Sequence, residues 1–563
     1  MFHPEIKELI QVTQLVEEGK EKEVFQIISK LEQKSDLSLK EQLSCDLVKA
    51  ELFRVVGNYL KAIETAEIAF QKAQKLGDLL SSFDALMIQT YSYMIMVNVN
   101  KSEALIEQAQ DLFNVIKETL KIDLRERECF LVKTKSGITY FKGDVQKTLE
   151  LNKKAYDLVK NTSNKRFMAS SLSNIAQMYS NMKEYDKAIL YAKDAIKLNE
   201  RYTLVHAFSN LIEIYVSKGE INEAKANLEL FREYIKKFDT ERHRVIYTFT
   251  EALVLKSSLR ARDRIKSEDL FKSIALNNSI NSEQRIDAII NLCDLCLTEL
   301  KITNDFEITT EIQGYIQELL DIANHQNAHL ILIETYILKG KLLLLTSNIK
   351  EAKRLLNQAQ DIAETYGLKQ LAINISNEHD KLLKQEKIWR RFKDSEVNFS
   401  ERLELAGLNE EIDDMMKKRI IEPPELIEEE PIYLLLISEG GLPIFTQSFI
   451  EDTSFEDHLF GGFFTAINSF INEMFSEGLD RASFGNHTLL MKSIFPFLLF
   501  YLYRGQSYLA QKRINSFIKE LKDHTEIWKK FEEFYEKSRK ISLKDIPSLA
   551  PLIKKTFIQK TLY

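Results

Sequence analysis

Apolar residues recur at three- and four-residue intervals over roughly the first 390 positions of the chain, with polar residues between them. This spacing places the apolar side chains on one face of a helix, so it predicts a long succession of amphipathic helices. The pattern changes beyond position 431, where residues 431–438 and 442–449 form apolar runs of strand length. We therefore expect a helical part followed by a smaller part that contains strands.

The helical part repeats itself. Residues 171–199 carry apolar and small side chains at fixed positions of two consecutive helices: Leu172, Ile175, Ala176, Tyr179, Ala188 and Ala195. The next block repeats them with Phe208, Leu211, Tyr215, Gly219 and Ala224. The alanines stand where two helices cross closely, and this set of positions resembles the tetratricopeptide (TPR) pattern. The resemblance implies helix pairs stacked into an all-α superhelical solenoid, here with repeat units longer than the shortest TPR unit.

The pattern also indicates where the parts of the chain end. Residues 240–330 have helical periodicity but match the repeat poorly, and we expect two irregular pairs there. Residues 370–420 read as an amphipathic connector or short coiled coil that breaks at Gly407. Pro423, Pro424 and the acidic residues 428–430 predict a hinge. The predicted organisation is a solenoid over 1–390, a connector and hinge over 391–430, and a small α+β domain over 431–563.

The pattern of residues 431–563 predicts strands and helices in the order β-β-α-β-β-β-α. Its strand pairs are joined by glycine-containing turns, and its helices cover residues 455–475 and 507–522. This order, with the phrase GLPIF opening the second strand, resembles the longin and roadblock superfamily. The resemblance implies a five-stranded antiparallel sheet packed against helices, and a docking role toward small GTPases or trafficking components. A profilin-like or PAS-like sensor domain remains an alternative, because both also use a central antiparallel sheet.

Composition narrows the functional classes. The chain has 563 residues, of which 44% are hydrophobic and 29% charged, and its net charge is -7. An acidic balance gives solubility and no general attraction to nucleic acid. Four cysteines are too few to staple a chain of this size, and no apolar run reaches the length of a membrane span. We expect a cytoplasmic protein with no transmembrane segment.

Motifs that carry catalysis or hold cofactors are not found in the sequence. It has neither GxxxxGK[ST] nor GxGxxG, which argues against nucleotide hydrolysis. Cys293 and Cys296 have metal-ligand spacing but stand in an apolar helical run, so we interpret them as buried thiols. His325 and His329 are interpreted as a surface pair, and Asp457 with His458 as part of an acidic first helical turn. The sequence predicts a protein that is not an enzyme, with no catalytic, cofactor or metal site.

Partner binding is the function that the pattern favours. Polar residues fall on the inward positions of the first helices in the two best-formed repeats, and we predict that they contact a peptide or protein segment: Asn174, Gln177, His206, Asn210 and Glu213. The C-terminal residues are rich in lysine, which is typical of a solvated face on a packed helical tail and also suits contact with an anionic membrane.

The leading hypothesis is a protein-interaction scaffold or adaptor. The solenoid would hold a protein segment, and the C-terminal module would dock a second partner, with a small GTPase as the partner that the resemblance implies. A homodimer through the sheet edge or a helix fits this interpretation. The alternative is a signalling protein whose C-terminal domain binds a small molecule.

Overall fold

The structure is a computed structural model, and it divides into two compact units that are described separately. The solenoid unit comprises residues 1–339, 362–369 and 399–422, and the C-terminal unit comprises residues 340–361, 370–398 and 423–563. The structure describes residues 15, 21–33, 37–237, 241–277, 282–394, 399–417, 428–438, 443–450, 481–484, 486–537 and 539–558.

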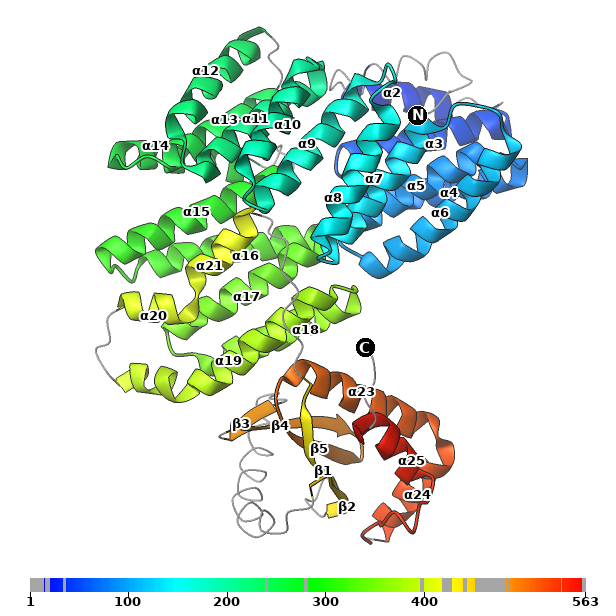
Figure 1. Ribbon diagram of the computed structural model, residues 1–563, viewed down its shortest axis with the longest axis vertical. Coiled ribbons are helices and arrows are strands. Elements are labelled where there is room, and N and C mark those ends of the chain that lie inside the picture. The colour runs from blue at the N-terminus through cyan, green and yellow to red at the C-terminus, as the bar shows by residue number, and fades with distance from the viewer. Residues whose placement is uncertain are drawn as a thin grey trace. The chain divides into compact units, whose positions relative to one another are not determined.

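Helix α2 (Glu21–Glu32) is followed by helices that succeed one another in pairs, as the periodicity predicts (Figure 1). The first helices of the pairs are α3 (Leu39–Val55), α5 (Leu79–Ile95), α7 (Arg125–Phe141), α9 (Lys165–Asn181), α11 (Arg201–Lys218), α13 (Glu241–Lys256), α15 (Ser282–Thr303) and α17 (His329–Leu345). The second helices are α4 (Tyr59–Leu76), α6 (Val99–Thr119), α8 (Val145–Val159), α10 (Tyr185–Lys197), α12 (Ile221–Lys237), α14 (Ala261–Ala275), α16 (Ile308–Gln326) and α18 (Ile349–Thr365). The expected TPR-like helix pairs are therefore present.

Helix starts and turns have local causes in the sequence. Short polar side chains at the position before several helices accept a hydrogen bond from the backbone amide three residues on, and so cap the helix: Asn58, Asp78, Asn98, Asp144 and Asn164. Tight turns within pairs use left-handed residues, such as Gly57 and Gly219 with φ of 80° and 84°. These signals recur in several of the repeats and keep the connections short.

The alanines of the repeat pattern lie where they were predicted. Ala176 on α9 and Ala188 on α10 are fully buried, in a core cluster that also holds Tyr179, Leu211 and Tyr215. A larger side chain at either alanine would force the two helices apart. The weakly patterned region 240–330 contains α13 to α16, which are the two pairs expected there.

The predicted connector contains two short helices, α20 (Phe399–Ala406) and α21 (Leu408–Lys417). Gly407 separates them with φ of 63°, which confirms the predicted break. Leu403 on α20 and Ile412 on α21 are fully buried, and α21 packs on α15 within the solenoid unit. The helical stretch is therefore amphipathic, and its apolar face is covered by the solenoid.

The C-terminal unit contains one five-stranded antiparallel sheet, as predicted. The strands are β1 (Glu430–Ser438), β2 (Pro443–Ser448), β3 (Arg481–Phe484), β4 (His487–Ile494) and β5 (Phe497–Arg504), in the order β2-β1-β5-β4-β3. Leu435 lies opposite Phe500 at the centre of the sheet. The predicted turn at residues 440–441, the helix 455–475 and the Asp457–His458 pair lie outside the described residues.

One face of the sheet carries the C-terminal helices α23 (Ser507–Asp523), α24 (Thr525–Glu536), α25 (Leu549–Ile553) and a short π-helix (Lys554–Ile558). Phe497 contacts Trp528, Phe531 and Tyr535 with ring centroids 5.5 to 6.0 Å apart. The backbone amide of Ile541 donates to the carbonyl of Ile444 on edge strand β2, at 2.6 Å. The tail thus packs into the core, and one of its residues occupies the outer edge of the sheet.

The C-terminal unit also includes α18 residues up to 361 and most of α19 (Lys369–Asp394). Arg481 on β3 is almost completely buried and donates to Gln360 of α18 at 3.0 Å and to Ser376 of α19 at 3.2 Å. Asp380 of α19 lies 3.4 Å from the Arg481 guanidinium and accepts a 3.0 Å hydrogen bond from the Ser507 amide. Polar contacts therefore join the sheet domain to these two helices.

Within the part of the chain that the structure describes, no helix combines the length and apolar character that crossing a bilayer requires.

Candidate functional site

The first helices of neighbouring pairs contact one another through a series of bridging side chains, which we call the first-helix ladder. It begins with Arg54 on α3, whose guanidinium carbon lies 4.7 Å from the ring centroid of Tyr91 on α5. Phe130 on α7 continues the stack, 5.8 Å from Tyr91. Cation–π contacts and ring contacts of this kind hold three consecutive first helices together at one surface.

An ion pair between Asp84 on α5 and Arg127 on α7 reinforces this part of the ladder. The Arg127 guanidinium donates two hydrogen bonds to the carboxylate, at 3.0 and 2.8 Å. Burial raises the pKa of Asp84, and the bonds from Arg127 act in the opposite direction. A bidentate, mostly desolvated pair fixes the register between α5 and α7, because breaking it leaves a buried charge.

The residues predicted to bind a partner lie on α9 and α11, in the middle of the ladder. Asn210 bridges the two helices by donating to the carbonyl of Ser173, at 3.2 Å. Asn174, Gln177 and His206 are exposed, while Asn210 and Glu213 are half-buried. The structure therefore places all five on two adjacent first helices, with three of them open to solvent.

Glu213 belongs to a polar chain that extends to the next first helix. The hydroxyl of Ser209 donates to Glu213 at 2.9 Å and lies 2.8 Å from the hydroxyl of Thr250 on α13. Further along, Lys256 on α13 pairs with Asp294 on α15 at 2.6 Å. Between α7 and α9 the ammonium of Lys133 donates to the hydroxyl of Ser170 at 2.5 Å. The ladder thus continues from α3 to α15 with a polar or aromatic bridge at each step.

Sequence reasoning missed Arg54, Tyr91, Lys133, Thr250 and Lys256 as members of this surface. A positional signal was available for one of them. Lys133 stands ten residues before the left-handed Gly143, and Ser173 stands ten residues before the left-handed Lys183. The looser repeats hide this correspondence, because their apolar positions match the pattern less well than residues 171–199.

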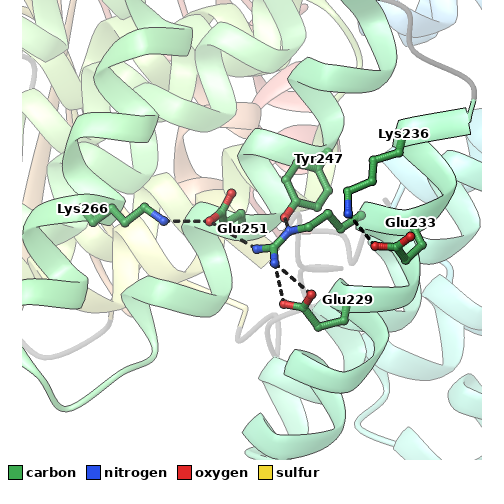
Figure 2. A network of polar contacts seen from close by, with 7 residues as sticks. Glu229, Glu233, Lys236, Tyr247, Glu251 and Lys266 are labelled. Atoms are coloured by element: carbon green, nitrogen blue, oxygen red, sulfur yellow. Dashed lines mark hydrogen bonds and ion pairs between the residues drawn. The ribbon is translucent and has the colours of Figure 1, made fainter.

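A second polar network lies away from the ladder, on α12, α13 and α14 (Figure 2). Arg232 of α12 donates to the Tyr247 hydroxyl at 2.8 Å and pairs with Glu229, while Lys266 of α14 pairs with Glu251 at 2.9 Å. Burial raises the pKa of Tyr247, although its bond to Arg232 opposes this. The network ties three successive helices together, but its ion pairs are largely exposed, so each stabilises only weakly.

The prediction that His325 and His329 form a surface pair is wrong for His329. His325 is exposed near the end of α16, but His329 is 8% exposed and stacks on Tyr366 with ring centroids 3.5 Å apart. Burial lowers the pKa of His329 to about 4. Asn327 takes a left-handed conformation between the two helices, with φ of 51°, and this turn separates the two imidazoles.

The thiols of Cys293 and Cys296 are buried on α15, as predicted. Burial raises the pKa of both, that of Cys296 to about 12, so neither is a thiolate at neutral pH. Over the described residues, no group of three or more His, Cys, Asp or Glu side chains is arranged to hold a metal ion.

The C-terminal unit holds one further buried ion pair, between Glu429 and Arg513 at 2.7 Å. Burial raises the pKa of Glu429, and the positive charge of Arg513 and the hydrogen bond from the Tyr501 hydroxyl oppose the rise. The pair links the start of β1 to α23. We interpret it as a structural contact that holds this segment against the helix.

Comparisons with known proteins add an architectural likeness only. No family model matches the chain, and neither does any curated protein sequence. The apo form of the quorum sensor NprR from B. thuringiensis is similar, with 14% identity, a TM-score of 0.43, and a match that covers 56% of this chain and 86% of that one. Aspartyl phosphate phosphatase F from Bacillus subtilis is also similar, with 16% identity, a TM-score of 0.39, and a match that covers 53% of this chain and 73% of that one. The apo form of RapI has 16% identity and a TM-score of 0.39, and the match covers 50% of this chain and 99% of that one. Scores at this level carry no inference about function.

Proposed function

We propose that this protein is an adaptor whose first-helix surface holds a segment of a partner protein. The observation that carries the proposal is the ladder itself, which runs without interruption from α3 to α15 and alternates polar, charged and aromatic side chains. Such a surface offers hydrogen-bonding groups to a peptide backbone and aromatic faces to apolar side chains. Asn174, Gln177 and His206 are the exposed groups best placed to begin that contact.

Site-specific photocrosslinking tests this proposal in the full-length chain. A photoreactive amino acid is placed at Asn174 or His206 on the ladder, or at Leu190 or Leu230 as controls. The two leucines are 56% and 60% exposed on the second helices α10 and α12. We expect the same partner to be captured from both ladder positions and from neither control.

Binding by the purified partner supplies the second half of the test. The double variant Asn174→Arg and His206→Glu keeps two exposed positions polar, so the fold should be retained. Its affinity for the captured partner should fall by about tenfold or more, since both substitutions act at one contact surface. Capture from all four positions alike, or an unchanged affinity, would contradict the proposal.

The C-terminal unit is proposed to dock a second partner. The support is its five-stranded antiparallel sheet packed on C-terminal helices, together with the resemblance to longin and roadblock domains, which points to a small GTPase. Aromatic side chains pack closely around Phe497 on the face of the sheet that carries the C-terminal helices, and this packing supports a docking module over a ligand-holding sensor. This role is tested by measuring whether purified small GTPases, in each of their two nucleotide states, bind the C-terminal unit with its helix α23 (Ser507–Asp523) intact.

A further inference from the structure

A later segment of the same chain reaches the far end of the first-helix ladder. Helix α21 packs on α15 within the solenoid unit (Figure 1). The Lys256 ammonium bridges α13 and α15 by pairing with Asp294 and by donating to Asn291 at 2.7 Å. The same ammonium also donates to the Met416 sulfur of α21, at 3.1 Å. Helix α21 is therefore in direct contact with the ladder at the α13–α15 step.

The two parts of the ladder differ in exposure. Asn174, Gln177 and His206 are open to solvent on α9 and α11. Asn291, which Lys256 contacts at the α13–α15 step, is only 4% exposed. The middle of the ladder is thus accessible to a partner, whereas the step that α21 reaches has its polar side chain buried.

Helix α21 contacts the solenoid with the spacing that a bound partner helix uses. Its buried residues Leu408, Ile412 and Met415 stand at positions i, i+4 and i+7, so they form one apolar face. Amphipathic helices that bind in protein grooves use the same spacing of apolar anchors. Glu410 and Asp414 are exposed on the opposite side of the helix. The segment therefore resembles a ligand of the surface that it covers.

The segment is too short to remain helical by itself. Helices α20 and α21 have 8 and 10 residues, and Gly407 separates them with φ of 63°. Isolated helices shorter than about 12 to 15 residues are only marginally stable in water, so the helical form of this segment depends on the surface beneath it. Release exposes the apolar face but restores backbone freedom, and such a local opening costs less than unfolding of the whole unit.

We infer that residues 399–417 are an intramolecular occupant of the ladder, and that an amphipathic helix of the partner binds at the α13–α15 step by displacing them. The inference rests on the proposed function and adds its regulation and the class of segment that is recognised. Because the occupant belongs to the same chain, its effective concentration at the surface is high. It keeps weakly binding segments out and admits a helix that binds more tightly.

Hydrogen exchange in the unmodified full-length chain gives the first test. Displacement requires local opening of α21, so the backbone amides of residues 409–416 should exchange at least about tenfold faster than those of α15. Mass spectrometry of proteolytic fragments separates the two helices. Equal protection of α21 and α15 would overturn the inference, because α21 would then be a permanent part of the core.

Binding of the isolated segment gives the second test. The probe is a blocked fluorescent peptide with the sequence of residues 399–417, and fluorescence anisotropy measures its affinity for full-length wild-type, Ile412→Asp and Glu410→Gln chains. Ile412 is 0% exposed, so a carboxylate at this position should release α21. Glu410 is exposed on the same helix and provides the matched control.

We expect Ile412→Asp to bind the peptide at least about tenfold more tightly than the wild type, because competition from the chain's own segment is removed. Glu410→Gln should bind it as weakly as the wild type does. A peptide of the same composition in scrambled order should bind none of the three chains. Equal affinity of the probe for wild type and Ile412→Asp, or equal binding of the scrambled peptide, would contradict the inference.

The melting temperature and the slow exchange of α15 confirm that the Ile412→Asp chain is folded. If this substitution unfolds the chain, the hydrogen-exchange comparison still decides the question, because it uses no variant.

The inference and the proposed function fail separately. The crosslinks from Asn174 and His206 are collected in both the wild-type and the Ile412→Asp chain. If they recover a partner but the peptide does not distinguish the two chains, the adaptor role stands and the intramolecular occupant fails. If they recover no partner from either chain while the peptide binds Ile412→Asp, the occupant is supported and the adaptor role fails.

Discussion

The buried imidazole of His329 makes the stability of the solenoid unit depend on pH. Its pKa is lowered to about 4 by burial, against about 6.5 in an unfolded chain. The unfolded state therefore binds the proton first as the pH falls, and stability decreases from pH 6.5 downward, by up to about 3 kcal/mol at pH 4. Urea unfolding at pH 7, 5.5 and 4.5 should show His329→Phe losing less stability on acidification than the wild type.

His325 provides the matched control for this prediction. It lies four residues earlier on α16 and is exposed, so His325→Phe should leave the pH dependence of unfolding unchanged. If the stability of His325→Phe and that of His329→Phe depend on pH to the same extent, stacking on Tyr366 does not keep the proton off His329. The sequence placed both histidines near a turn but gave no sign of the stack, because Tyr366 stands at the far end of the α17–α18 pair that His329 begins.

At the scale of elements, a further prediction concerns the turn between α18 and α19. Gly367 has φ of 81°, and a side chain at this position would meet the Asn100 carboxamide at 2.3 Å. Asn100 donates to the carbonyl of Thr365 at 3.0 Å, and the Val99 amide donates to that of Tyr366 at 3.1 Å. Gly367→Ala should cost about 2 to 3 kcal/mol, from backbone strain together with loss of the Asn100 contact.

A substitution at Gly77 measures the backbone strain without the loss of a contact such as that of Asn100. It has φ of 66°, and nothing lies within 4 Å of the position that a Cβ atom would occupy there. Gly77→Ala should therefore cost only the strain of about 1 kcal/mol, measured by the same urea unfolding. If both variants cost the same, the contact between residues 99–100 and 365–367 contributes no stability.

The elements themselves followed from the sequence where a local signal existed. The alanines at helix crossings, the break at Gly407 and the strand-length apolar runs each depend on residues close together in the chain. The contacts that sequence reasoning missed join distant positions. Arg54 meets Phe130 across two pairs, and Val99 meets Tyr366 across most of the solenoid unit. Such contacts depend on how the pairs stack, which local periodicity does not encode.

At the scale of the whole molecule, the contacts of Arg481 indicate that α18 and α19 form part of the C-terminal unit. Arg481 is 1% exposed, and its described partners Gln360, Ser376 and Asp380 all lie on those two helices. Gln360 also donates to Gln511 of α23. The domain boundary proposed from the change of periodicity at position 431 therefore excludes residues to which the sheet domain is bonded.

The effect of Arg481→Met should depend on the fragment that carries it. In residues 340–563 the substitution leaves Asp380 without its cation, so we expect urea unfolding to show a loss of about 3 kcal/mol. In residues 423–563 Gln360, Ser376 and Asp380 are missing, so the same change should cost less there. The shorter fragment should also be less stable, since Ser507 and Gln511 lose partners on α18 and α19. An equal cost of Arg481→Met in both fragments would show that these helices do not stabilise the sheet domain.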